Sequence, residues 1–242
     1  MKEQLLRTED LVKTYYKKCV VNKVNISINE SEIVGLLGPN GAGKTTTFYM
    51  SVGLVRANSG KVFFRGEEIT SCSMSQRARK GIGYLAQEPS VFRKLTVKEN
   101  IMSILETMDM NRVQRNERLD QLLERMNIST LVNQYAYTLS GGERRRLEIA
   151  RSLVTEPKFL MLDEPFSGVD PIAVAEVQQI IKTLRDEGMG ILLTDHNVRE
   201  TLLATDRTYL MYEGKVLKSG NAKELAEDAE AKRLYLGESF SF

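Results

Sequence analysis

The sequence is poor in the residues and patterns that mark several common classes of protein. It has two cysteines, five prolines, one histidine and no tryptophan among 242 residues. Cys19 and Cys72 lie far apart and in no metal-ligand spacing, which argues against a disulfide framework and a cysteine-based metal site. No apolar run approaches the roughly 20 residues that a membrane-spanning helix needs. The first 16 residues mix charged and apolar side chains, unlike a signal peptide.

The charge balance is also close to neutral. The formal net charge is +2, from 34 basic and 32 acidic side chains. This excess is too small to indicate nucleic acid or an anionic membrane as the main partner. We therefore expect a cytoplasmic protein with no nucleic-acid partner, which contacts a membrane only through other proteins.

The sequence has the composition of an ordinary globular protein, and segments with strand patterns alternate with segments with helix patterns. Hydrophobic residues make up 42% of the chain and charged residues 27%, which is typical of a soluble domain with a real core. Short apolar segments bounded by turn residues predict strands. The expected strands cover residues 5–12, 24–28, 33–37, 159–162, 190–194 and 207–212.

The middle of the chain is predicted to be helical, from about residue 96 to residue 154. Thr96 and Glu99 have capping-box spacing at the start of one helix. A helical stripe of apolar residues follows, at Leu119, Leu122, Leu123 and Met126. The pattern predicts an α/β fold with a mainly parallel sheet and an inserted helical subdomain. We expect the core to comprise residues 1–87 and 158–242, and the helical subdomain about 88–157.

A glycine-rich loop follows the apolar segment 33–37 and precedes a helical stretch. Its sequence GPNGAGKT, at 38–45, matches the phosphate-binding pattern G-x-x-x-x-G-K-[ST]. Glycines let the backbone turn its N–H groups toward phosphate oxygens, Lys44 can reach the β- and γ-phosphates, and the Thr45 hydroxyl can bind Mg²⁺. The residues expected to bind the nucleotide here are Gly38, Pro39, Asn40, Gly41, Ala42, Gly43, Lys44, Thr45 and Thr46.

A second chemical signal is an apolar segment that ends in two carboxylates, FLMLDE at 159–164. A strand beside the phosphate-loop strand would present both acids at the phosphate end of the sheet. Asp163 suits Mg²⁺. Glu164 is placed to orient or deprotonate an attacking water. By itself a strand that ends in two acids is common, but together with the phosphate loop it strongly indicates an ATP-hydrolysis site.

A third motif is LSGGE at 139–143, followed by three arginines. Ser140 can cap the helix, and the two glycines expose its N-terminal amides, which makes a second anion site. One phosphate chain needs only one such loop, so the motif suggests ATP gripped from a second subunit; an ordinary capped helix is the alternative. Arg144, Arg145 and Arg146 are predicted to form a solvated face, with Leu147, Ala150 and Val154 facing inward.

In this order, the three motifs resemble the ABC ATPase family over essentially the whole chain. The resemblance implies one nucleotide-binding domain, 1–242, with a RecA-like P-loop NTPase core and antiparallel N-terminal strands. It implies ATP and Mg²⁺ as ligands, and a homodimer on ATP binding. Ser140 and Gly142 would contact the γ-phosphate held by the opposing subunit, and Gln87 would touch Mg²⁺ and the water. The interface would contain Ser140, Gly141, Gly142 and Asp170.

The resemblance also gives two isolated residues a role. His196 resembles the switch histidine that holds the γ-phosphate and water against Glu164; a lone histidine is otherwise a packing or surface residue. Tyr15 resembles the aromatic that stacks on adenine, although Tyr16 is adjacent, and the alternative is an ordinary aromatic at a strand edge. The predicted catalytic residues are thus Glu164, His196, Gln87 and Lys44, with Thr45, Gln87 and Asp163 at the metal.

Finer segments resemble the lipopolysaccharide-export ATPases of Gram-negative envelopes. They are GLLGPNGAGKTTTFYM, GERRRLEIAR, LDEPFSGVDP, TDHNVRETL and RLYLGESF. Ala86 stands where this family usually has proline, and the tail 240–242 is more apolar than in its relatives. The resemblance implies that Phe92 and Arg93 line a groove for two integral membrane subunits. The alternative is that Phe92 folds back into the helical subdomain.

Three other functions remain open from the sequence. The ATPase of a branched-chain amino acid importer would have the same chemistry and another substrate. A soluble ABC protein would have no membrane partner, but such proteins carry two cassettes or a long coiled-coil insertion, and neither is present here. A regulator without turnover is disfavoured because Lys44, Gln87, Asp163, Glu164 and His196 are all intact.

Overall fold

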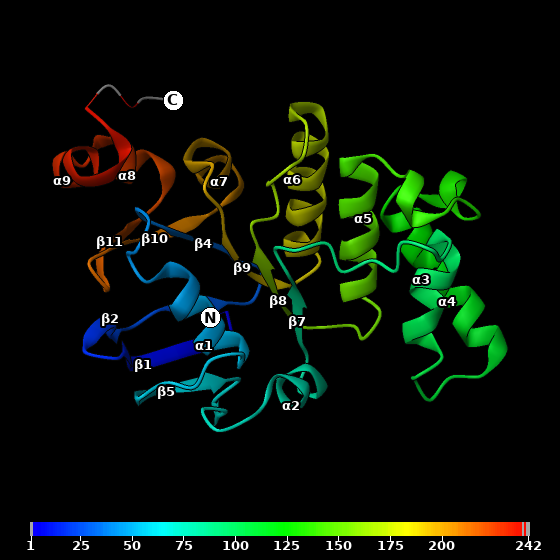
Figure 1. Cartoon of the computed structure of the whole chain (residues 1–242), viewed down its shortest axis with the longest axis horizontal. Helices are drawn as coiled ribbons and strands as arrows, with labels where there is room; N and C mark the ends of the chain where they lie inside the picture. The colour runs from blue at the N-terminus through cyan, green and yellow to red at the C-terminus, as the bar shows by residue number, and fades with distance from the viewer. Residues whose placement is uncertain (1, 239, 241–242) are drawn as a thin grey trace.

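The computed structural model describes residues 2–238 and 240, and it arranges them as two sheets flanked by helices (Figure 1). The strands are β1 (Gln4–Tyr15), β2 (Lys18–Val24), β3 (Ser27–Asn29), β4 (Ile33–Leu37), β5 (Ser59–Phe64), β6 (Glu67–Glu68), β7 (Ile82–Leu85), β8 (Phe159–Asp163), β9 (Gly190–Thr194), β10 (Arg207–Tyr212) and β11 (Lys215–Gly220). The α-helices are α1 (Lys44–Val52), α2 (Met74–Arg79), α3 (Val97–Leu105), α4 (Arg112–Arg125), α5 (Gly141–Ser152), α6 (Pro171–Asp186), α7 (Val198–Ala204), α8 (Ala222–Glu227) and α9 (Ala229–Ala231). Two 3₁₀ turns, η1 (Ser129–Leu131) and η2 (Ala136–Thr138), and one π-helical turn, η3 (Lys232–Leu236), complete the described elements.

The larger sheet positions the site. Its strand order is β11-β10-β4-β9-β8-β7, and every neighbouring pair except β10 and β11 is parallel. All residues of β4, β8 and β9 are buried, as the apolar runs predicted. The carboxyl ends of these three adjacent strands therefore meet at one edge, where ligands bind in open α/β sheets. The predicted mainly parallel sheet is confirmed.

The smaller sheet is antiparallel and confirms the predicted N-terminal strands. Its path is β2-β1-β5-β6, with β3 paired to β1. The expected single strand at 24–28 is wrong, because β2 ends at Val24 and β3 begins at Ser27. Between them Ile26 bonds to Thr8 twice: its N–H donates to Thr8 Oγ1 at 2.9 Å, and its carbonyl accepts from the Thr8 N–H at 2.9 Å.

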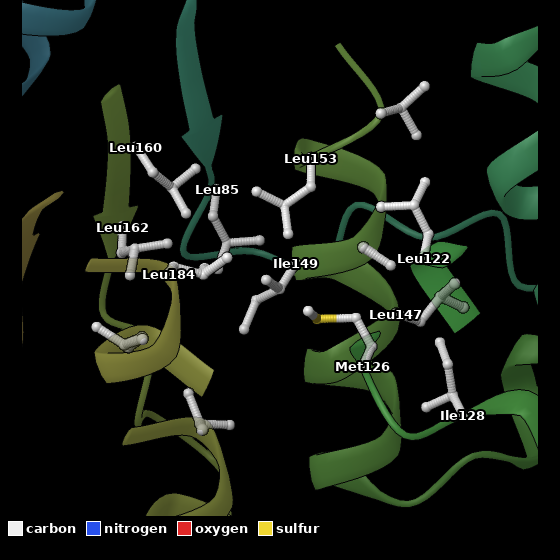
Figure 2. Close-up of a cluster of buried hydrophobic side chains, with 14 of the residues drawn as sticks. Leu85, Leu122, Met126, Ile128, Leu147, Ile149, Leu153, Leu160, Leu162 and Leu184 are labelled. Carbon is white, nitrogen blue, oxygen red and sulfur yellow. The ribbon is translucent and has the colours of Figure 1, made fainter. Parts of the chain in front are cut away.

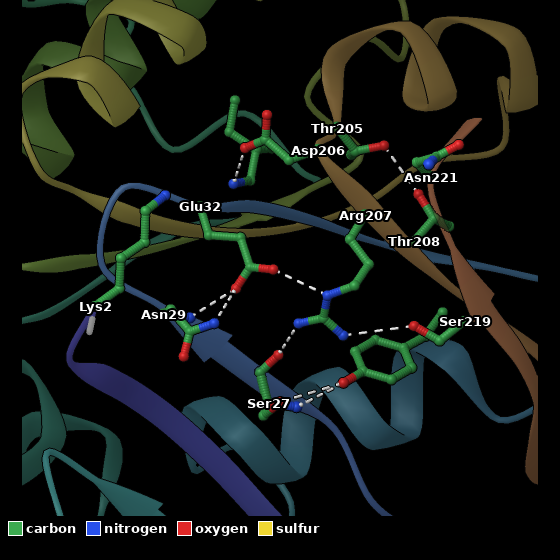
Figure 3. A network of polar contacts seen from close by, with 12 residues as sticks. Lys2, Ser27, Asn29, Glu32, Thr205, Asp206, Arg207, Thr208, Ser219 and Asn221 are labelled. Carbon is green, nitrogen blue, oxygen red and sulfur yellow. Dashed lines mark hydrogen bonds and ion pairs between the residues drawn. The ribbon is translucent and has the colours of Figure 1, made fainter. Parts of the chain in front are cut away.

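A polar network fastens β3 to the larger sheet (Figure 3). Arg207, the first residue of β10, donates to Glu32 at 2.9 Å and to the Ser27 carbonyl at 2.7 Å. The Tyr209 hydroxyl accepts from the Ser27 N–H at 3.0 Å, and Glu32 also accepts from the Asn29 N–H at 2.8 Å. These contacts set the start of β4, and hence the position of the loop that follows it.

The helices α3, α4 and α5 lie together beside the sheet edge at β7 (Figure 1). Thr96 and Glu99 form the predicted capping box at the start of α3, and the stripe Leu119, Leu122, Leu123 and Met126 is buried as predicted. Figure 2 shows α5 between two apolar layers: Leu147 faces α4, whereas Ile149 and Leu153 face Leu85 and Leu160 of the sheet. Each fully buried leucine contributes about 1.5–3 kcal/mol. The α5 helix thus joins the helical region to the sheet.

One sequence prediction for α5 is wrong. Arg145 is not solvated, since its side chain is 5% exposed and its guanidinium contacts Glu148 at 2.9 Å. The same guanidinium donates to the carbonyls of Asp163, Glu164 and Pro165. Leu147, Ala150 and Val154 are buried as expected. Among the helices in residues 2–238, none is long and apolar enough to span a bilayer.

Candidate nucleotide-binding and hydrolysis site

The phosphate loop connects β4 to α1 at the carboxyl edge of the larger sheet. Gly43 is the N-cap of α1, with φ 95°, a left-handed conformation that glycine adopts without strain. A Cβ on Gly43 would lie 2.5 Å from the Val20 carbonyl oxygen, so no other side chain fits there. The first turn of α1 therefore opens toward the loop with free amides, which is an arrangement suited to an anion.

Lys44 begins α1 and folds its ammonium group into the loop. Nζ donates to the carbonyl oxygens of Gly38 at 2.5 Å and Pro39 at 3.1 Å, and the residue is buried. Burial lowers the pKa of Lys44, and the nearby Glu164 carboxylate partly offsets this. The lysine is thus desolvated and held beside the anion cradle, where a phosphate oxygen would be a strong partner.

Asp163 ends β8 and has an unused oxygen. It is 2% exposed, and its Oδ2 is buried with no hydrogen-bond partner. Burial raises the pKa of Asp163, while the Tyr49 hydroxyl acts in the opposite direction. A buried carboxylate oxygen without a donor fits a cation, and Thr45, exposed in the first turn of α1, offers a hydroxyl.

These oxygen donors fit Mg²⁺. Within the described part of the chain, no group of three or more His, Cys, Asp or Glu side chains could hold a metal by itself. Mg²⁺ is usually bound by one or two carboxylates together with substrate phosphates, and it keeps several waters. Asp163, Thr45 and the amide oxygen of Gln87 are the residues that could complete such a shell.

Glu164 is held by two residues from distant segments. Gln87 Nε2 donates to Glu164 Oε2 at 2.8 Å, and His196 Nε2 lies 2.6 Å from Glu164 Oε1. Glu164 has φ 49°, a left-handed conformation that is uncommon for a glutamate, and strain of this kind gathers at functional sites. The structure therefore brings together three of the four predicted catalytic side chains, Glu164, Gln87 and His196. The fourth, Lys44, lies close enough to Glu164 for the carboxylate to raise the pKa of the lysine.

Several residues of this site were not predicted from the sequence. The Asp195 carboxylate, 3% exposed, accepts from the N–H groups of Phe166 at 2.9 Å and Asn197 at 2.9 Å, so it ties the histidine loop to the turn after Glu164. Burial raises the pKa values of Tyr49 and Tyr84, and both hydroxyls lie beside Asp163. Tertiary contacts create these roles, and no local motif signals them.

Arg145 was also missed, although the sequence does hold a signal for it. It lies three residues before Glu148 and four before Ile149, on the same buried face of α5. It also donates to the carbonyl of Ala86 at 3.3 Å, the residue that precedes Gln87. One arginine therefore contacts the backbone on both sides of the site, at Ala86 and at the turn after Asp163.

The LSGGE segment lies apart from the phosphate loop in this chain. Ser140 caps α5 in a capping box with Glu143, as predicted. A Cβ on Gly142 would lie 2.5 Å from the Cβ of Ala173, so the glycine allows α5 and α6 to approach. Within residues 2–238, no hydrogen bond or ion pair joins Ser140 to the loop. Gly141 is half-buried, and Asp170 caps α6; their places in a dimer interface stay predictions.

The predicted adenine platform lies at the end of β1. Tyr15 is 42% exposed, with Lys13 Nζ 5.1 Å from its ring centroid. The following strand β2 contacts α1 and carries Val20, whose carbonyl approaches Gly43. The hairpin that carries Tyr15 therefore approaches the phosphate loop through Val20, and stacking of the exposed ring on adenine stays a prediction.

Phe92 is an exposed ring in the segment after Gln87. It is 52% exposed, the Arg151 guanidinium lies 4.9 Å from its centroid, and Arg93 is exposed next to it. Its backbone is fixed by Asn100, which accepts from the Phe92 N–H at 2.8 Å and donates to its carbonyl at 3.0 Å. The ring is therefore presented at the surface rather than buried in the helical region. The tail residues 241 and 242 lie outside the described residues.

Comparison with known proteins agrees with this geometry. The sequence matches the ABC transporter family over residues 21–167. It is 53% identical to the lipopolysaccharide export system ATP-binding protein LptB of Haemophilus influenzae, and the alignment covers 98% of each chain. It is 49% identical to LptB of Escherichia coli K12, over 97% of this chain and 98% of that protein.

Solved structures give the same result. An ATP-binding cassette of an ABC transporter in its ADP conformation superimposes with a TM-score of 0.87 at 28% identity, over 97% of this chain and 99% of that one. The protein cbiO1 of Clostridium perfringens, part of an ABC transporter complex, also gives 0.87 at 30% identity, over 96% and 94%. The chain therefore belongs to the ABC transporter family and is one of its ATP-binding cassettes.

Proposed function

We propose that this protein is the ATP-hydrolysing subunit of a lipopolysaccharide-export transporter. One observation carries the hydrolytic part: Glu164 is held between Gln87 and His196, beside a carboxylate with a free oxygen and a buried lysine. The substrate class rests on the printed names of relatives that align over nearly the whole chain at 49% and 53% identity.

Each side chain has a role in this proposal that follows from its chemistry. Lys44 and the amides of α1 hold the β- and γ-phosphates, and they stabilise the charge that develops on the phosphoryl oxygens. Glu164 accepts a hydrogen bond from the attacking water and aligns it with the γ-phosphorus. His196 and Gln87 fix the carboxylate. Mg²⁺, when held by Thr45, Gln87 and Asp163, would neutralise phosphate charge.

The protein works as a homodimer in this proposal. Within residues 2–238, no hydrogen bond or ion pair joins Ser140 to the phosphate loop of the same chain, and its helix N-terminus suits an anion. A second copy would supply that helix to the γ-phosphate, so that ATP closes the dimer and loss of the γ-phosphate opens it. Asp170 and the glycines at 141 and 142 would lie at the interface.

The opening is passed to two integral membrane subunits of the LptF/LptG kind. Gln87 and Phe92 belong to one continuous segment, so a change at the catalytic carboxylate moves the surface that carries Phe92 and Arg93. The protein would lie on the cytoplasmic face of the inner membrane, held there by these partners. Extraction of lipopolysaccharide for export to the outer membrane would be the work performed.

A single variant, Glu164→Gln, tests both parts of the proposal. The amide cannot take a proton from water, so hydrolysis should fall by at least about 100-fold, the low end for a lost general base. ATP binding and ATP-dependent dimerisation should persist. Glu106→Gln, an exposed glutamate at the end of α3, is the matched control and should leave hydrolysis unchanged. Near-normal turnover by Glu164→Gln would refute the role of Glu164.

The same variant identifies the partners. Tagged Glu164→Gln protein with ATP and Mg²⁺ is used to capture proteins from detergent-solubilised native membranes. Multi-spanning proteins of the lipopolysaccharide-export type support the proposal. Subunits of an amino acid importer would keep the ATPase and overturn the substrate, and an empty capture would favour a soluble ABC protein.

A further inference from the structure

A pocket of about 310 Å³ lies where α4 and α5 meet α6, and none of its described lining residues belongs to the nucleotide site. The helices α5 and α6 run side by side in Figure 1. The floor of the pocket is apolar: Met126 is the C-cap of α4, and Ile180 and Leu184 lie one turn apart on α6. Met126 and Leu184 are each 1% exposed and belong to the buried cluster drawn in Figure 2. Because its floor is part of the core, the pocket is pre-formed, as ligand sites usually are.

An arginine lies at each end of this floor. Arg146 of α5 forms an ion pair with Glu176, near the start of α6. Arg125, the last residue of α4, forms one with Glu187, the C-cap of α6. Each helical residue adds about 1.5 Å, so the two glutamates are about 16 Å apart along the axis of α6. The pocket is therefore an apolar trough with a cation at each end.

Both arginines are more buried than the acids that pair with them. The side chains of Arg146 and Arg125 are 12% and 28% exposed, whereas those of Glu176 and Glu187 are 49% and 46% exposed. Within residues 2–238, the Nε of each arginine is buried with no hydrogen-bond partner. Burial lowers the pKa of Arg125, and the charge of Arg118 acts in the same direction. An ion pair with an exposed acid contributes little net free energy, so another anion can replace the glutamate.

The size and charge of the pocket indicate the kind of ligand. Its volume is at the low end of the range for small-molecule sites, about 300–1,000 Å³, which favours a small molecule over a segment of another protein. Among the described residues that line it, two are cationic and one is acidic, so an anion is favoured. The arginines already pair with carboxylates, whose two oxygens match the planar guanidinium. The ligand that fits is thus a carboxylate with a short aliphatic chain.

We propose that this pocket binds a small aliphatic carboxylate. The ligand's head group replaces Glu176 as the partner of Arg146, the more buried of the two arginines, and Glu176 turns outward into solvent. The aliphatic chain covers Met126, Ile180 and Leu184. A bound ligand then contacts α5 of the helical region and α6 of the core together. The inference goes beyond the proposed function and does not depend on it, because no described residue is common to the two sites.

Octanoate is the probe, and the titration of ¹⁵N-labelled protein is followed by NMR. Amide shifts in residues 125–127 and 176–184 should move, with a Kd of about 1 mM or tighter, as for a ligand of about ten non-hydrogen atoms. Octanamide keeps the chain and removes the charge, whereas acetate keeps the charge and removes the chain. Both should bind at least about tenfold more weakly, because each lacks one half of the recognition.

Two variants that break the same ion pair should change the affinity in opposite directions. Arg146→Gln removes the cation and should raise the Kd for octanoate about five- to tenfold. Glu176→Gln removes the competing carboxylate and should lower this Kd about two- to fivefold. Both variants lose one exposed ion pair, so their Tm values should change by similar amounts. Arg112→Gln, exposed at the other end of α4, is the control and should match the wild type.

Each outcome decides for or against the pocket. Opposite changes in the two variants, together with shifts at residues 176–184, would support it. Octanamide that binds as tightly as octanoate would overturn it, because the arginines would then contribute nothing. Shifts centred on residues 38–45 would overturn it by placing the carboxylate at the phosphate loop. Changes in the same direction for Arg146→Gln and Glu176→Gln, or no binding below about 10 mM octanoate, would also overturn it.

Discussion

Replacing Arg145 by methionine should be among the most damaging single changes outside the phosphate loop. The guanidinium is 5% exposed and pairs with Glu148, whose side chain is 3% exposed. It also donates to four backbone carbonyls, at 3.3 Å to Ala86, 3.3 Å to Asp163, 2.5 Å to Glu164 and 3.0 Å to Pro165. Methionine fills part of the volume and replaces none of these bonds.

The expected loss follows from what remains buried after the change. Glu148 keeps a hydrogen bond from the Ser90 N–H at 3.3 Å and the more distant charge of Arg151, but it loses its ion-pair partner. Removing one partner of a buried ion pair costs about 3–5 kcal/mol, because the other charge loses its direct compensation. A natural domain has only about 5–15 kcal/mol of stability in total. Arg145→Met should therefore lose a large part of the free energy of unfolding, and its turnover should fall because Glu164 and Ala86 lose a backbone anchor.

Urea denaturation of the purified protein, followed by circular dichroism, measures this loss. Arg144→Met in the same helix is the control; Arg144 is half-buried with no ion pair among the described residues, and its variant should stay within about 0.5 kcal/mol of the wild type. The double variant Arg145→Met/Glu148→Leu should recover part of the loss, since no lone charge remains buried. A loss below about 1 kcal/mol for Arg145→Met, the range of surface ion pairs, would refute the reasoning.

Three further changes probe the loop and one helix start. Gly43 has φ 95°, and a Cβ there would lie 2.5 Å from the Val20 carbonyl oxygen, so Gly43→Ala should lower the free energy of unfolding in urea by about 1–3 kcal/mol and abolish ATP binding. Gly188→Ala, at φ 102° in open space, measures the cost of backbone strain alone; equal losses for the two variants would refute a steric clash at Gly43. Thr96→Ala removes the cap of α3 and should cost about 1 kcal/mol, seen as a lower Tm, and an unchanged Tm would show that the capping box contributes nothing. Burial lowers the pKa of Lys44 below its ordinary value of 10.5, so between the folded pKa and 10.5 the unfolded state binds more protons and native stability rises with pH. In urea denaturation, the free energy of unfolding of the wild type should therefore increase relative to that of Lys44→Met as the pH is raised toward 10.5, and the opposite trend would contradict the burial of the ammonium.

The fold class was predictable because the relevant signals are local. Apolar runs such as 33–37 and 190–194 give buried parallel strands in any arrangement that covers both faces of a sheet. The capping box at Thr96 and the apolar stripe of α4 require only residues three and four positions apart. The strand predicted at 24–28 failed because β1 changes its partner there, from β2 at Val24 to β3 at Ser27, and the Ile26 N–H donates to the Thr8 hydroxyl between the two.

The candidate site was predictable in its parts and not in its assembly. The phosphate loop and the Asp163–Glu164 pair have spacings that follow from phosphate and metal chemistry, so the sequence alone predicted those residues. That Gln87 and His196 meet on the two oxygens of Glu164 depends on the order of β7, β8 and β9 in the sheet. Strand order is a non-local property, and no window of sequence contains it.

By itself the sequence thus determined the class of fold and predicted the kind of ligand and the residues proposed to carry the chemistry, because helix caps, strand periods and phosphate loops depend on near neighbours. The tertiary structure alone decided that the Arg145 guanidinium donates to the backbone carbonyls of Asp163, Glu164 and Pro165. These three partners are backbone carbonyls, which every residue type carries. The spacing of Arg145 to Glu148 and Ile149 can therefore indicate that the arginine faces inward, but which carbonyls it contacts is decided only when the fold brings the two segments together.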